Sequence, residues 1–120
     1  MAVAEICIEE NHLLEAGASI YYAVLDCCRA LLAVLEKDAK THKGVIHLLN
    51  ENFIKTGILE TEYGKILSES LKIRLQSDYD DFYVIEKDSV TALLADCHKF
   101  YNRTVSILKE NYNISRDDEK

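Results

Sequence analysis

The sequence predicts an all-α protein, and three observations support this fold class. The chain has no proline and only four glycines, so little interrupts a helix. Leucine, alanine, glutamate and lysine, which favour helices, are abundant. Several segments repeat apolar residues every three or four positions, the spacing of one helical face. With 120 residues, the chain is long enough for one core but too short for two.

The first two helices are expected at residues 2–16 and 18–37, with Gly17 as the stop between them. The second segment is apolar around most of its circumference, and such a helix is expected at the centre of a domain. Its polar exceptions fall on one narrow strip, which is either an exposed ribbon or a polar seam against another helix. They are Tyr22, Asp26 and Arg29.

A third helix is expected after the polar link at residues 37–42, and Thr41 or His42 is its predicted cap. Gly57 lies beyond its predicted end. Its inward residues are expected to be Val45, Ile46, Leu49 and Phe53. Thr61 then offers an N-cap for a fourth helix.

The last helix is expected at about residues 88–111, with Asp88 or Ser89 as its cap. Its apolar stripe is predicted to comprise Val90, Leu94, Cys97, Tyr101, Thr104 or Val105, Leu108 and Tyr112. The helices together predict a single domain over residues 1–115. Residues 116–120 are expected to form a disordered polar tail.

Arg74 is the first candidate for a functional residue. At 100° per residue it projects between Tyr63 and Leu67 of the fourth helix, with Asp78 one turn further on the same side. A guanidinium on a core-facing stripe is costly unless it is paired. Three outcomes are open: a pair with Asp78, a pair with a carboxylate of another helix, or a cleft that receives an anion. Buried charges of this kind often mark functional sites.

The formal charge of −7 argues against a protein that binds long nucleic acid through a broad basic surface. A local basic groove remains compatible with the composition. The only dense basic patch comprises Lys37, Lys40, His42 and Lys43, which ordinarily would form a solvated loop. The sequence contains no phosphate-binding glycine loop, no dinucleotide fingerprint and no His-Glu-x-x-His motif.

The four cysteines are expected to be reduced, small core residues. Cys27 and Cys28 are adjacent in a predicted helix, which suits a disulfide framework poorly. A metal cluster completed by His98 would lack the usual short ligand spacing, so no metal and no cofactor are expected. The beginning of the sequence does not resemble a signal peptide, and no apolar run approaches the roughly 20 residues of a membrane helix. A cytoplasmic protein without a membrane partner is therefore expected.

Three stretches resemble the HEPN superfamily, small helical domains of prokaryotic toxin–antitoxin and defence systems. The stretches are IYYAVLDCCRALLAVL at 20–35, KTHKGVIHLLNENFIKTGIL at 40–59 and IRLQSDYDDF at 73–82. Their order and spacing are similar to those of the stand-alone HEPN branch. The resemblance implies an antiparallel four-helix bundle with a short additional helix, and it implies a homodimer.

The resemblance also implies a chemistry. Many HEPN proteins are metal-independent ribonucleases whose motif is an arginine, four to six residues and a histidine, at the dimer cleft. Arg74 matches the arginine, but Tyr79 and Asp80 stand five and six residues later, and the next histidine is His98. Attack by a 2′-hydroxyl needs a group that exchanges protons near pH 7, which an imidazole does and a phenol does poorly.

The leading hypothesis is a HEPN-like homodimer that acts with a protein partner, such as a minimal nucleotidyltransferase of a toxin–antitoxin pair. RNA or a nucleotide would bind in its dimer cleft. The alternative is an endoribonuclease toxin in which Arg74 holds the phosphate and Asp78 or Tyr79 serves as acid–base group. A third hypothesis is a regulatory module that binds nucleotide without turnover.

In some toxins of the superfamily the partner adenylylates a tyrosine, the seventh residue beyond the arginine. That position is Asp81 in this chain, so Tyr79 or Tyr83 would have to take the role.

Overall fold

The computed structural model describes residues 2–10, 12–79 and 86–112, with side chains for 3–10, 12–76 and 86–112. Its elements are α1 (Ala2–Glu9), α2 (Leu13–Ala33), α3 (His42–Leu49), the π-helical η1 (Asn50–Ile54), α4 (Thr61–Tyr79) and α5 (Lys87–Tyr112). Within these ranges there is no β-strand, so the predicted all-α class is confirmed.

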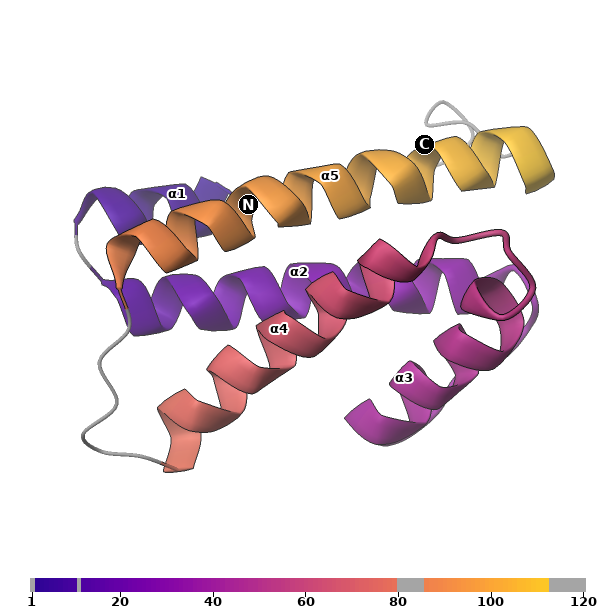
Figure 1. Cartoon of the computed structure of the whole chain (residues 1–120), viewed down its shortest axis with the longest axis horizontal. Coiled ribbons are helices and arrows are strands. Elements are labelled where there is room, and N and C mark those ends of the chain that lie inside the picture. The colour runs from indigo at the N-terminus through magenta and orange to yellow at the C-terminus, as the bar shows by residue number, and fades with distance from the viewer. Residues whose placement is uncertain (1, 11, 80–85, 113–120) are drawn as a thin grey trace.

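Helix α2 is the central element and contacts α1, α3, α4 and α5. In Figure 1, α1 and α5 lie along one side of α2, while α4 and α3 lie along the other. Following the colours from the N-terminus, α1 and α4 run opposite to α2 and α5. These four helices form the antiparallel bundle, and α3 with η1 is the short addition.

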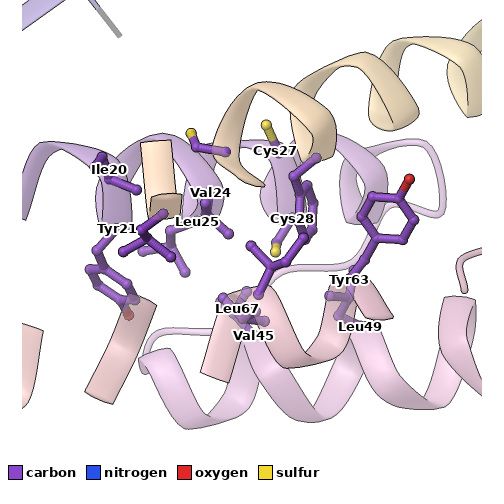
Figure 2. Close-up of a cluster of buried hydrophobic side chains, with 14 of the residues drawn as sticks. Ile20, Tyr21, Val24, Leu25, Cys27, Cys28, Val45, Leu49, Tyr63 and Leu67 are labelled. Atoms are coloured by element: carbon purple, nitrogen blue, oxygen red, sulfur yellow. The ribbon is translucent and has the colours of Figure 1, made fainter. Parts of the chain in front are cut away.

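The core lies where α2 faces its neighbours. Tyr21, Phe53 and Phe100 are its largest fully buried side chains. Figure 2 shows apolar side chains of α2 packed toward α3 and α4. Those labelled include Ile20, Val24, Leu25, Cys28, Val45, Leu49 and Leu67.

The composition of α2 would also allow a membrane span by length and hydropathy alone. No membrane helix was predicted, since no apolar run in the sequence approaches the roughly 20 residues that such a helix needs. In the structure, 56% of the apolar window of α2 is buried inside the domain. Packing as the core helix therefore accounts for its apolar character.

The predicted boundary between the first two helices was wrong. Gly17 does not end a helix but is buried inside α2, and the chain turns earlier, where the His12 N–H donates to the Cys7 carbonyl at 2.6 Å. A glycine inside a helix costs only about 1 kcal/mol relative to alanine, which core packing offsets. At its other end α2 stops at Ala33, before the predicted residue 37, and Glu36 has a positive φ of 55°.

The start of α3 agrees with the prediction. Thr41 is the N-cap, and its hydroxyl accepts a hydrogen bond from the Gly44 N–H at 3.0 Å. Gly57, with φ of +81°, follows the end of η1, a backbone conformation that glycine adopts without strain. Thr61 is the first residue of α4 rather than the residue before it.

The face of α5 that turns inward differs from the predicted stripe. Its buried residues are Val90, Leu93, Cys97, Phe100, Thr104 and Ile107. These buried residues form the seam between α5 and the core. Four residues of the predicted stripe are only partly buried and flank the seam: Leu94, Tyr101, Leu108 and Tyr112. The true seam alternates steps of three and four residues, which is the pattern of helices that pack at a shallow angle. Both stripes are apolar, and only the position of α2 decides between them.

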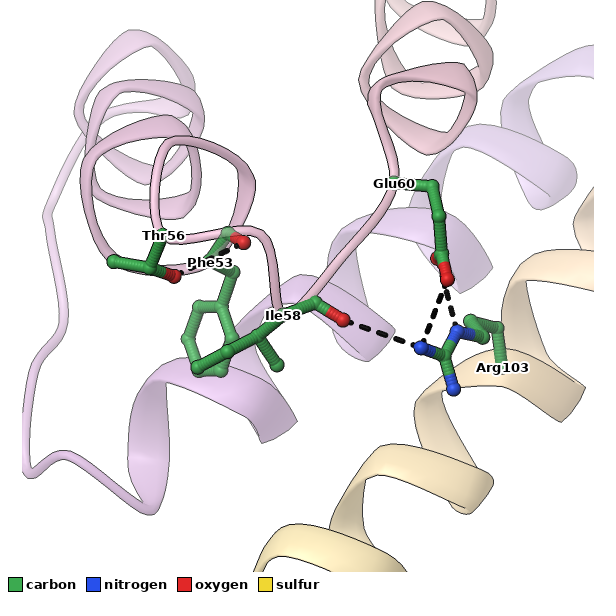
Figure 3. Close-up of polar contacts among 5 residues, drawn as sticks. All are labelled: Phe53, Thr56, Ile58, Glu60 and Arg103. Carbon is green, nitrogen blue, oxygen red and sulfur yellow. Dashed lines mark hydrogen bonds and ion pairs between the residues drawn. The ribbon is translucent and has the colours of Figure 1, made fainter.

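A polar contact ties α5 to the segment before α4 (Figure 3). Arg103 Nε donates to Glu60 Oε2 at 2.9 Å, and Arg103 Nη2 lies 2.9 Å from Glu60 Oε1. The same Nη2 donates to the Ile58 carbonyl at 3.2 Å. This bidentate contact fixes where α4 begins relative to α5.

Acid is expected to remove the stabilisation that Glu60 contributes. The hydrogen bond from Arg103 lowers the pKa of the Glu60 carboxyl below its ordinary value. A carboxyl whose pKa is depressed by folding stabilises the protein above its unfolded pKa, and this stabilisation is lost as the pH falls through the folded pKa. Because the Glu60 side chain is 49% exposed, solvent screening limits the effect to less than about 1 kcal/mol.

Urea unfolding of the wild type and Glu60→Gln measures this effect. We expect the wild type to have a higher free energy of unfolding than Glu60→Gln at pH 7, and we expect this difference to disappear at pH 3. Glu69→Gln, at an exposed carboxyl without a described ion pair, is the control and should show no such difference. A Glu60→Gln difference that persists at pH 3 would contradict the assignment.

Candidate functional site

Arg74 lies in α4 at the edge of the buried face of that helix. Ser70 and Ile73 beside it are buried, whereas the Arg74 side chain is half-buried. Its guanidinium carbon lies 5.8 Å from the centroid of the Tyr22 ring of α2, the geometry of a cation–π contact. Arg74 thus stands between α4 and α2, and it reaches the polar strip that the sequence singled out on α2.

Tyr21 is the fully buried neighbour in this cluster. Its ring centroid lies 5.5 Å from that of Tyr22. The Tyr21 hydroxyl is buried and has no hydrogen-bond partner in the part of the chain that the structure describes. In Figure 2 this hydroxyl points away from the labelled aliphatic side chains of the core. Burial, and then the nearby Tyr22, raises the pKa of Tyr21, so the hydroxyl keeps its proton at neutral pH and remains a donor.

His42 brings an imidazole to the same cluster. It is the first residue of α3, it is exposed, and its ring centroid lies 5.3 Å from that of Tyr21. From its place in the sequence, His42 was predicted to be a cap of α3 or a member of the basic patch. No spacing in the sequence relates it to Arg74, because the two residues meet the tyrosine pair from different helices.

The remaining predicted site residues stand at and beyond the end of α4. Asp78 and Tyr79 belong to its last turn, but their side chains lie outside the described residues, as does all of Tyr83. The predicted pairing of Arg74 with Asp78, and the roles of Asp78 and Tyr79 as acid–base groups, therefore stay predictions. The tail at residues 116–120 also lies outside the described residues.

Tyr21→Phe is expected to raise the free energy of unfolding by about 1 kcal/mol, because a buried hydroxyl without a partner costs stability. Urea unfolding measures the change. Tyr22→Phe is the matched control: the Tyr22 side chain is 46% exposed, and its change should stay within about 0.5 kcal/mol. A clear loss of stability in Tyr21→Phe would mean that the hydroxyl has a partner in solution.

The cysteines and His98 lie outside the Arg74 cluster and contribute to the packing of the fold. None of the four cysteines, all of which lie in the described ranges, forms a disulfide, and burial raises the pKa of the Cys27 thiol to about 11. Cys28 and Cys97 are likewise buried with raised pKa values, which agrees with small core residues of low reactivity. His98 Nε2 lies 3.4 Å from Glu5 Oε1 and links α5 to α1. No group of His, Cys, Asp or Glu side chains within the described ranges could hold a metal ion.

A separate cavity of about 500 Å³ lies between η1 and α4. Its lining includes Ile54, Asn50 and Gly64. A Cβ added to Gly64 would lie 2.9 Å from Ile54 Cδ1, so this glycine allows α4 to approach η1. The residues of the Arg74 cluster do not line this cavity.

The antiparallel helical bundle defines a small all-α domain, in which a half-buried arginine contacts Tyr22 and a histidine contacts the neighbouring Tyr21. Comparison with known proteins agrees with this class: the HEPN domain matches residues 1–110. The chain therefore belongs to the HEPN domain family.

Two relatives carry toxin names. Two proteins of Methanocaldococcus jannaschii, each named "Putative toxin", are 36% identical over 93 residues and 29% identical over 110 residues. The first alignment covers 78% of this chain but only 63% of the relative, and the second covers 92% and 81%. A UPF0332 protein of Archaeoglobus fulgidus is 29% identical over 94 residues, which cover 78% of this chain and 74% of the relative.

Proposed function

We propose that this chain is the HEPN component of a toxin–antitoxin-type or defence system. It acts as a homodimer together with a protein partner, such as a minimal nucleotidyltransferase, and its Arg74 face binds a phosphate group of RNA or a nucleotide. The family and the toxin names of the relatives support a toxin-like role.

The observation that carries the proposal is the position of the Arg74 guanidinium. It is half-buried and 5.8 Å from the Tyr22 ring, so it is held at the surface between α2 and α4 without being withdrawn from it. A guanidinium offers several N–H donors in a planar fork that matches a phosphate. The surface around it is suited to a protein contact as well, because Tyr22 and Leu75 are large apolar side chains that are 46% and 43% exposed.

Two measurements test the assembly. Light scattering coupled to size exclusion should give twice the mass of the chain, and Leu75→Glu should shift it toward the monomer because a charge would enter the interface. Val3→Glu, at an exposed apolar residue of α1, is the control.

Co-expression with a minimal nucleotidyltransferase encoded beside this gene should yield a complex. A monomer at high concentration that captures no such partner would refute the proposed assembly.

A metal-independent endoribonuclease is the second candidate, and the position of His42 favours it. His42 lies beside Tyr21, and Tyr21 lies beside the Tyr22 ring that Arg74 contacts, so this imidazole supports an acid–base role although the linear motif has no histidine. In such a reaction the 2′-hydroxyl loses its proton to a base and attacks phosphorus, the P–O5′ bond breaks, and the leaving 5′ oxygen takes a proton from an acid. The products carry a 2′,3′-cyclic phosphate and a 5′-hydroxyl.

Incubation of labelled RNA with the protein in EDTA tests this candidate. Cleavage that Arg74→Ala abolishes while the helical circular dichroism is retained would favour the ribonuclease. Intact RNA after prolonged incubation with the wild type would reject it and leave the binding role.

A further inference from the structure

The cavity between η1 and α4 is a surface feature that the Arg74 cluster does not use, and we call it the η1–α4 groove. Its floor is apolar, because Leu67 is buried and Ile46 and Ile54 are partly buried against the core. Its mouth is polar and faces solvent. The exposed lining residues are Thr61, Lys65, Ser68 and Glu69.

The two walls of the groove are faces of helices that lie on the same side of α2 (Figure 1). Lining residues on the wall of α3 and η1 are spaced by four positions: Ile46, Asn50 and Ile54. Those on the α4 wall extend from Thr61 to Glu69. At 1.5 Å per residue each wall is about 12 Å long, which is roughly two helical turns. A groove between two helices with this spacing matches the apolar face of a third helix.

Local backbone features keep the groove open. The Lys55 N–H donates to the Asn50 carbonyl at 2.9 Å, which is the five-residue spacing of a π-helical turn, and such turns often lie at functional sites. On the opposite wall, Gly64 and Ser68 are one turn apart and have little or no side chain. The small residues leave room for the side chains of an incoming helix.

The mouth of the groove carries one charge of each sign. Lys65 and Glu69 are one turn apart on α4, where an ion pair is common, yet neither forms an ion pair within the part of the chain that the structure describes. The Asn50 side-chain amide, on the other wall, likewise makes no hydrogen bond among the described residues. These groups are therefore free to contact a partner. A small molecule fits less well, because ligand pockets enclose most of their ligand and this groove is exposed along its mouth.

We infer that the η1–α4 groove is the docking site for an amphipathic helix of the protein partner. The inference rests on the proposed function, in which the chain acts with such a partner. The partner helix packs aliphatic side chains, spaced by three or four residues, on Ile46, Ile54 and Leu67. It places a carboxylate near Lys65 and a cation near Glu69. This charge pair sets the direction of the helix, because the reversed direction would bring like charges together.

The first test fills the groove with Ser68→Trp. The probe is the minimal nucleotidyltransferase encoded beside this gene, and isothermal titration calorimetry measures its affinity. We expect the affinity to fall at least about 30-fold, the effect of losing one interface hot spot. Asn102→Trp, at an exposed position of α5 outside the groove, adds the same bulk and should bind like the wild type. Unchanged circular dichroism and unchanged mass in light scattering exclude a loss of fold or assembly.

The second test reverses a charge with Lys65→Glu. The affinity for the probe is expected to fall about 10-fold at low salt, and the difference should shrink at high salt because ions screen exposed charges. Lys109→Glu, at an exposed position in the last turn of α5, is the charge-matched control and should have little effect. Equal losses in the two variants would show that only net charge matters, and the groove would then have no special role.

The outcomes separate this inference from the proposed function. Ser68→Trp that binds the probe as tightly as the wild type would overturn the groove and leave the partner role intact, whereas a wild type that does not bind the probe would overturn both. A photo-crosslinking amino acid in place of Ser68 identifies the occupant. A crosslink to a helix of the probe supports the inference. A crosslink to a second copy of this chain, or to a non-helical segment of the probe, would overturn it.

Discussion

Arg74→Gln is expected to lower the affinity for single-stranded RNA by about 10- to 150-fold. A hydrogen bond to a charged group contributes about 1.5–3 kcal/mol, and glutamine offers neither the charge nor the planar fork of the guanidinium. Fluorescence anisotropy measures the change. Arg74 is only half-buried, at the edge of the core face of α4. The loss of affinity is therefore expected without a large loss of stability.

Two further variants sharpen the result. Lys72→Gln removes a positive charge from an exposed position of the same helix and should change the affinity little. Arg74→Lys keeps the charge but loses the fork, so an intermediate affinity is expected. Equal losses in Lys72→Gln and Arg74→Gln would show that only the net charge of α4 matters, and Arg74 would then have no special role.

Phe100→Ala is expected to cost about 3–5 kcal/mol of unfolding free energy, the largest effect on stability among the variants considered. Phe100 is fully buried in α5, and its ring meets that of Tyr63 edge to face with centroids 5.6 Å apart. Truncation removes the transfer free energy of the ring, leaves a cavity and breaks the aromatic pair. Urea unfolding with circular dichroism detection measures the loss.

Tyr101→Ala is the matched comparison, because the sequence pattern and the structure disagree about these two neighbours. Tyr101 was predicted to face inward, but the structure leaves it partly buried at the flank of the seam. Tyr101→Ala should therefore cost clearly less than Phe100→Ala. The reverse order would indicate that α5 is rotated by about one residue relative to the described packing.

Several parts of the fold could be predicted because they depend on neighbouring residues. The cap at Thr41 needs only a hydroxyl three residues before an unsatisfied N–H, and Gly57 needs only a backbone position with positive φ. The central place of α2 follows from its apolar circumference. The error at Gly17 has the opposite origin, since burial against other helices outweighed its local preference.

The candidate site was predictable only in part. Periodicity placed Arg74 near the core face of its helix, and it isolated Tyr22 on a polar strip of α2. Periodicity could not predict that Arg74 would contact Tyr22, and it could not predict that His42 would lie beside Tyr21. Contacts between helices depend on their crossing and rotation, which no single helical repeat specifies.

The sequence by itself determined an all-α chain, the approximate helices and a set of chemically interesting side chains, because helix propensity, capping and apolar periodicity act over a few residues. Only the tertiary structure decided which face of α5 is buried and which of those side chains meet. Packing around α2 selects one rotation for each helix, and that selection brings Arg74, the tyrosine pair and His42 into one cluster.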